Sequence, residues 1–123
     1  PQTVAVAAFV GTPQMNLMAG SWANDAVTVD GHVLQVAQTT PAARDVMLGV
    51  RPSDLRIGPA GLPAHIERIE DLGDTAIISL TAGDRPLKVK GDLQNARKGG
   101  DHVFLSFAPH AAHLFDPNDG SRL

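Results

Sequence analysis

The 123-residue sequence has no cysteine, no tyrosine and a single tryptophan, Trp22. Without cysteine there are no disulfides, no thiolate catalysis and no thiolate metal site, which fits a reducing compartment. No apolar run approaches the roughly 20 residues that a membrane-spanning helix needs. A secretory leader, with a basic and then an apolar segment, is also absent. Because the first residue is Pro1 rather than Met, we expect a fragment or a processed chain.

The chain also lacks the motifs of common catalytic sites. Its lysines are Lys88, Lys90 and Lys98, and none is followed by Ser or Thr. The loop Gly-x-x-x-x-Gly-Lys-Ser/Thr that surrounds a nucleotide's phosphates is therefore missing, and so is the Gly-x-Ser-x-Gly context of a hydrolase nucleophile. We expect no catalytic residue and no ATP hydrolysis by this chain alone.

Charge and aromatic content argue against nucleic-acid binding. The net charge is −3, and the aromatic residues are four Phe and one Trp. A protein that holds single strands usually combines a basic surface with stacking platforms. We therefore expect no nucleic-acid partner.

What the sequence does contain is a series of short apolar segments between turn residues, in a length that suits one domain. Asp30-Gly31 separates two of these segments and predicts a tight hairpin. The expected strands are 27–29, 33–36, 46–51, 64–71, 76–80, 87–90, 103–107 and 112–115. Strands of this length and spacing predict an all-β fold for most of the chain, either a barrel or a sandwich.

Three details refine this prediction. Arg68 marks an irregularity in the 64–71 strand, and residues 87–90 place Leu and Val on one face and both Lys on the other. Pro52 ends the third strand and begins a helical turn, 52–55. Thr3 is placed to cap a short N-terminal helix that Gly11 and Pro13 would stop, although the same Val-rich segment also suits a strand.

Three runs combine unusual residues at close spacing. Residues 9–16 read Phe-Val-Gly-Thr-Pro-Gln-Met-Asn, in which a Gly, a φ-locked Pro and an Asn predict a defined turn. Residues 49–52 read Gly-Val-Arg-Pro, where the proline favours an extended Arg51 at the strand end. Its guanidinium suits either a contact across a protein boundary or a bond within its own helical turn. Residues 114–120 read Leu-Phe-Asp-Pro-Asn-Asp-Gly and predict a closing turn.

Together the three runs resemble the C-terminal regulatory domain of ATP-binding subunits from ABC importers of the sugar and glycerol-phosphate type. The turn 71–75, Asp-Leu-Gly-Asp-Thr, resembles the same family, whereas Val4 to Ala8 replace its usual Phe-Val-Ala approach. The resemblance implies a small OB-like barrel of antiparallel strands. Residues 1–123 would form a single regulatory OB-type domain, in which 1–12 lead in from a missing upstream ATPase domain.

The resemblance also implies a role. The domain would be non-catalytic and would stabilise the subunit dimer during ATP-driven transport, with no cofactor in this chain because ATP and Mg would bind upstream. Expected partners are a second copy, the upstream ATPase domain, the membrane-spanning subunits through that domain, and a regulatory protein. The expected location is the cytoplasmic face of the inner membrane. Expected protein-contact residues are Gly49, Arg51, Pro52, Phe115 and Asp116; the turn that begins the domain comprises Gly11, Pro13, Met15 and Asn16.

One alternative from the residues remains open. It is a barrel that binds a small ligand, either an oxyanion or a sugar. An oxyanion site would need convergent N–H groups and cations, and Arg85, Lys88 and Lys90 lie close in sequence. Pro109 and strand-like neighbours argue against a helix that would place His110 and His113 on one face, and no third ligand is evident, so no metal site is expected there. The acidic residues Glu67, Glu70 and Asp71 fit a solvated strand face better than paired catalytic carboxylates.

Overall fold

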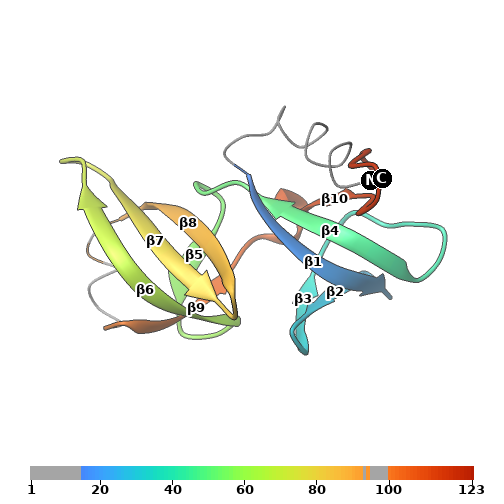
Figure 1. Cartoon of the computed structure of the whole chain (residues 1–123), viewed down its shortest axis with the longest axis horizontal. Coiled ribbons are helices and arrows are strands. Elements are labelled where there is room, and N and C mark those ends of the chain that lie inside the picture. The colour runs from blue at the N-terminus through green and yellow to red at the C-terminus, as the bar shows by residue number, and fades with distance from the viewer. Residues whose placement is uncertain (1–14, 93, 95–99) are drawn as a thin grey trace. The chain divides into compact units, whose positions relative to one another are not determined.

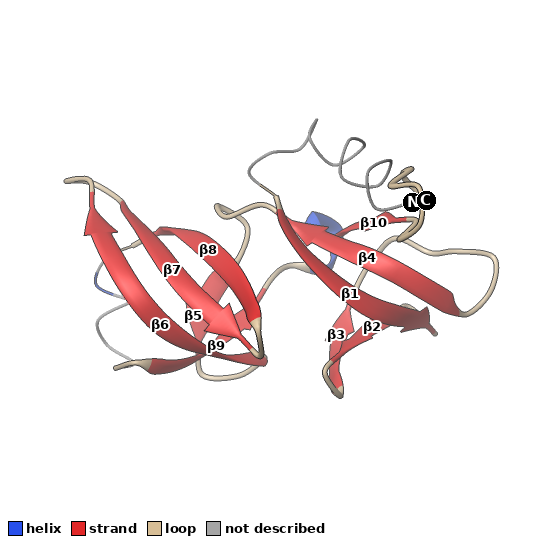
Figure 2. Cartoon of the chain, in the orientation of Figure 1, coloured by secondary structure: helices blue, strands red, loops and turns tan. Residues whose placement is uncertain are grey.

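The computed structural model describes residues 15–92, 94 and 100–123 (Figure 1). The predicted N-terminal helix and the turn residues Gly11 and Pro13 lie outside these residues. Contacts along the chain define two compact units, the first made of Pro1–Val50 with Ala108–Leu123 and the second of Arg51–Phe107. Each unit contains one antiparallel sheet, and strands account for most of the regular structure (Figure 2). The prediction of a mainly β protein is confirmed.

The first unit has the strand order β10-β4-β1-β2-β3. Its strands are β1 (Asn16–Ala23), β2 (Ala26–Val29), β3 (His32–Gln35), β4 (Arg44–Val50) and β10 (His113–Phe115). Side chains alternate between the two faces of a strand, and β4 accordingly buries Val46, Leu48 and Val50 at 1% exposure or less. Met18 and Leu114 lie opposite Leu48 on either side and complete the apolar layer.

Two tight turns shape this sheet. Asp30 and Gly31 both have positive φ, at 52° and 81°, and join β2 to β3 as the sequence predicted. Asn24 and Asp25 have φ of 52° and 63° and join β1 to β2 in the same way. Strand β1 was not among the predicted strands.

The second unit has the strand order β5-β9-β6-β7-β8 and forms a half-barrel. Its strands are β5 (Arg56–Gly58), β6 (Leu62–Asp71), β7 (Ala76–Ala82), β8 (Arg85–Gly91) and β9 (His102–Ser106). The Lys90 amide donates a 2.9 Å hydrogen bond to the Pro52 carbonyl, next to β5, so the two edges of the sheet approach each other. The strands thus form two sheets, where the family resemblance implied one small barrel.

Two local predictions for the second unit, the irregularity near Arg68 and the two faces of residues 87–90, are confirmed. The register of β6 against β7 shifts between Ile66 and Arg68, which is the irregularity expected near Arg68. On β8, Leu87 and Val89 are buried and both lysines are exposed. This β8 edge carries Pro86 and two Lys, which are residues that discourage edge-to-edge pairing.

The helical elements of the described residues are single turns. The amides of Asp54 and Leu55 donate to the Arg51 carbonyl at 2.9 and 3.1 Å, which forms the predicted helical turn. A 3-10 turn, η1, spans Pro109–Ala111. Within the described ranges, no helix is long and apolar enough to cross a membrane.

Candidate functional site

Three residues, one from each sequence run, meet in the first unit around Gly49. Gly49 lies in β4 between Leu17 of β1 and His113 of β10. A Cβ added there would overlap Met15 Sδ and lie 2.9 Å from Phe115 Cε2. Met15 and Phe115 are buried, at 8% and 5% exposure. We call these three residues the Gly49 cluster, in which each run supplies one member.

The neighbours of the cluster include a buried asparagine and an exposed arginine. Asn16 is buried at 8% exposure and lies opposite Val50 in the β1–β4 ladder. The Arg122 guanidinium stands 5.5 Å from the centre of the Phe115 ring, and the two residues form an isolated bridge. The predicted contact residues Gly49 and Phe115 therefore present little surface of their own to another protein.

Asp116 organises the closing turn. Its Oδ1 accepts the amides of Asn118 at 2.7 Å and Asp119 at 3.2 Å, and its Oδ2 pairs with Arg44 Nη2 at 2.7 Å. The Asn118 amide, followed by the Arg44 guanidinium, holds the pKa of Asp116 below its usual value of 3.8. The Asp116 carbonyl accepts the Gly120 amide at 2.8 Å. The predicted turn is confirmed, whereas Arg44, 72 residues away, carries no local signal of this role.

Arg51 and Pro52 begin the second unit. The Arg51 backbone carbonyl anchors the helical turn, while its side chain is exposed. Pro52 is half-buried, and its carbonyl accepts the bond from β8. The backbone carbonyl of Arg51 thus anchors the turn.

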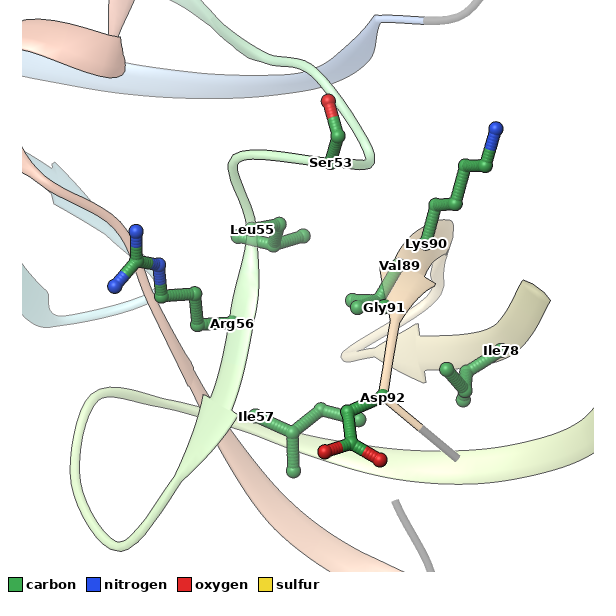
Figure 3. Close-up of a pocket in the computed structure, with 9 residues that line it drawn as sticks. All are labelled: Ser53, Leu55, Arg56, Ile57, Ile78, Val89, Lys90, Gly91 and Asp92. Carbon is green, nitrogen blue, oxygen red and sulfur yellow. The ribbon is translucent and has the colours of Figure 1, made fainter. Parts of the chain in front are cut away.

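A pocket of about 340 Å³ opens between β5 and β8 of the same unit (Figure 3). It is lined by Ser53, Leu55, Arg56, Ile57, Ile78, Val89, Lys90, Gly91 and Asp92. Leu55, Ile78 and Val89 are buried, at 1–4% exposure, and supply the apolar part of its wall. Figure 3 shows the Arg56 and Lys90 side chains extending away from each other on opposite sides. The arrangement suits a small, mainly neutral molecule better than an anion held between two cations.

The remaining candidates from the sequence are dispersed. Lys88 Nζ donates to Ser79 Oγ at 3.3 Å and Arg85 Nη1 to the Ala82 carbonyl at 3.3 Å, and neither residue lines the pocket. Glu67 accepts the Thr81 hydroxyl at 3.0 Å, and Asp71 accepts the Gly73 amide at 2.8 Å. The two carboxylates are thus engaged in separate local contacts.

The predicted histidine pair falls on two different elements. His110 lies in η1 and is exposed, whereas His113 is half-buried and opens β10. Among the described residues, no group of three or more His, Cys, Asp or Glu could hold a metal ion.

Comparison with known proteins identifies the family. The model of the TOBE domain matches residues 48–115, which include the whole half-barrel, the run 49–52 and the first two residues of the run 114–120. Over the full chain, the sequence is 34% identical to an sn-glycerol-3-phosphate import ATP-binding protein, UgpC, of Cereibacter sphaeroides and 29% identical to UgpC of Escherichia coli K12. An uncharacterized ABC transporter ATP-binding protein, y4oS, of Sinorhizobium fredii is 32% identical.

These alignments cover 35–37% of the relatives' own length. The chain thus corresponds to about a third of such a protein, and the phosphate-binding loop is not in its sequence. The resemblance drawn from the three runs is confirmed, because the relatives are ATP-binding proteins of ABC transporters and two of them are named for glycerol-phosphate import. The chain belongs to the TOBE domain family.

Proposed function

We propose that this chain is the non-catalytic regulatory and dimerisation domain of the ATP-binding subunit of an ABC importer for sugars or related solutes. The observation that carries the proposal is the alignment of the whole chain with about a third of several ATP-binding proteins. Glycerol 3-phosphate is the first solute to test, because the named relatives import it. ATP and Mg would bind outside this chain, in an upstream ATPase domain on the cytoplasmic face of the inner membrane.

In this proposal two copies stay in contact while the ATPase domains close and open. A regulatory protein or effector that prefers one arrangement would shift the cycle by its difference in affinity for the two states. The membrane-spanning subunits would be reached through the ATPase domain. The half-barrel supports an OB-like fold for the second unit, because a backbone bond links the edge strand β8 to the turn that precedes the other edge strand, β5.

Exposure divides the proposed contact residues into two groups. Arg51 is exposed and Pro52 and Asp116 are half-buried, so these three can meet a second copy directly. Gly49 and Phe115 would act from inside, by holding the strand and the turn that carry the others. Met15 and Asn16 would do the same at the start of the domain.

Dimerisation can be tested by size-exclusion chromatography with light scattering over a range of protein concentrations. We expect reversible dimers that Arg51→Ala weakens, because the variant loses the guanidinium but keeps the carbonyl that anchors the turn. Arg68→Ala, which removes another exposed guanidinium from the same unit, is the matched control. A strict monomer at high concentration, or equal weakening by both variants, would count against the proposal.

The pocket between β5 and β8 favours a second candidate, a small-ligand barrel. Its volume lies in the usual range for ligand sites, and the Asp92 carboxylate at its rim can accept hydrogen bonds from hydroxyl groups. These features support a sugar or polyol over an oxyanion. Calorimetric titration with sugars, glycerol phosphate, phosphate, sulfate and molybdate tests it, with Asp92→Asn as the variant. Flat titrations would leave the protein-contact role.

A further inference from the structure

Two histidines far apart in the sequence lie side by side on the half-barrel. His65 in β6 is directly opposite His102 in β9, strands that are neighbours in the sheet (Figure 1). Their ring centroids are 5.0 Å apart and the ring planes are inclined by 55°. His65 is half-buried and His102 is exposed. Both rings therefore lie on the outer face of the sheet, where small solutes can reach them.

The ladder brings these two side chains as close as a sheet allows. The Ile66 amide donates a 2.7 Å bond to the Asp101 carbonyl, so residues 66 and 101 form a hydrogen-bonded pair. Because such pairs alternate with non-hydrogen-bonded ones, His65 and His102 occupy a non-hydrogen-bonded pair. Side chains are closer in this kind of pair, with Cβ atoms at the short end of roughly 4.5–5.5 Å.

The neighbouring strands place a hydroxyl group, a carboxylate and a proline ring near the histidine pair. Thr81 of β7 lies opposite His65 on its other side, and its hydroxyl donates to the Glu67 carboxylate at 3.0 Å. On the next strand, Pro86 of β8 lies opposite Thr81 in the same row. The row across β9, β6, β7 and β8 is therefore two imidazoles, a hydroxyl and an apolar ring, with a carboxylate next to the hydroxyl.

We propose that His65 and His102 together form a binding site for a divalent transition-metal ion such as Zn²⁺. Neutral imidazole is the commonest protein ligand for these ions, and Zn–N bonds of about 2.0–2.1 Å allow one ion to join two adjacent rings. Two protein ligands leave the other coordination positions to water or to a group from another molecule. The bound ion ties β6 to β9 through side chains, in addition to their backbone ladder.

The first test uses Zn²⁺ alone as the probe and the purified chain. We expect isothermal titration to give one Zn²⁺ per chain and zinc to raise the Tm above its value in EDTA, because the ion binds the folded arrangement preferentially. His102→Gln should weaken zinc binding roughly tenfold or more, since one ring loses the advantage of a second ligand held beside it. The same variant should match the wild type in EDTA, because His102 is exposed.

Three further variants test whether zinc binding depends on this histidine pair. His65→Gln should have the same effect on zinc binding as His102→Gln, and His32→Gln, an exposed histidine on β3, should have none. His102→Cys should retain binding, because a thiolate is also a zinc ligand. Co²⁺ absorption then distinguishes nitrogen from sulfur ligands. Zinc binding that is absent from the wild type, unchanged in His102→Gln, or lost equally in His32→Gln would overturn the proposal.

Discussion

Replacing Gly49 with alanine tests whether the three sequence runs serve the interior of the first unit. The new Cβ would overlap Met15 Sδ and lie 2.9 Å from Phe115 Cε2. Met15 has a flexible side chain and can move aside in part. Phe115 is less free, because its backbone is paired with Met47 and its ring faces Arg122. The substitution therefore has to displace at least one buried side chain.

The magnitude follows from two opposing effects. Overpacking of a filled site costs about 1–3 kcal/mol. Removing a glycine from the unfolded chain returns about 0.4–1 kcal/mol. The net loss in unfolding free energy for Gly49→Ala should be about 1–2 kcal/mol. With a urea slope of about 1.5 kcal/mol/M, that loss lowers the midpoint by roughly 1 M.

Urea unfolding followed by fluorescence is a direct assay, because Trp22 is the one tryptophan and is buried in the first unit. Met15→Ala supplies the matched background, since it removes the sulfur that the new Cβ would meet. The cost of Gly49→Ala should shrink there, with a coupling of about 1 kcal/mol between the two sites. If Gly49→Ala leaves the midpoint unchanged, or costs the same in both backgrounds, the packing argument fails.

Two other substitutions probe single contacts. Gly61→Ala should cost roughly 3 kcal/mol or more in urea unfolding, because φ of 132° strains any Cβ and the new atom would meet the rigid backbone carbonyl of Leu105. Gly58→Ala, where no atom lies within 4 Å of the new Cβ, should cost nothing by comparison. Asp116→Asn should lower stability at pH 7. A carboxyl with a lowered folded-state pKa stabilises above its unfolded value of 3.8 and loses that contribution as the pH falls through the folded value. The gap between wild type and Asp116→Asn in urea melts should therefore close in acid, and a gap independent of pH would contradict the Arg44 pairing.

The strands predicted from sequence were those with a local signal. Asp30-Gly31 marked a hairpin, and the broken alternation around Arg68 marked the shift in β6. Strand β1 lacked such a signal, because Asn16 and Gly20 interrupt its inward, apolar face. Its turn, Asn24-Asp25, contains no glycine and adopts positive φ only because Asn and Asp tolerate it.

Long-range pairing explains the other differences. Strand β5 has three residues and exists through its pairing with β9, whose partner residues lie about fifty positions away. The same holds for the site. The sequence identified the three runs, but the ladder of β1, β4 and β10 brings Met15, Gly49 and Phe115 together. The His65–His102 pair also depends on register, so neither residue stood out in the sequence.

Burial divides the residues of the three runs into those that stabilise the fold and those that can contact another protein. Residues of the Gly49 cluster are inside the first unit, so their replacement should act on unfolding and reach association only through the fraction of chains that unfold. Arg51 is exposed, and contacts of exposed charged side chains contribute only about 0–1 kcal/mol, so Arg51→Ala should reduce association with a small change in the urea midpoint. Measuring both properties for Gly49→Ala and Arg51→Ala assigns each residue to one role. If Gly49→Ala abolished association in a chain that remained fully folded, the cluster itself would belong to the interface.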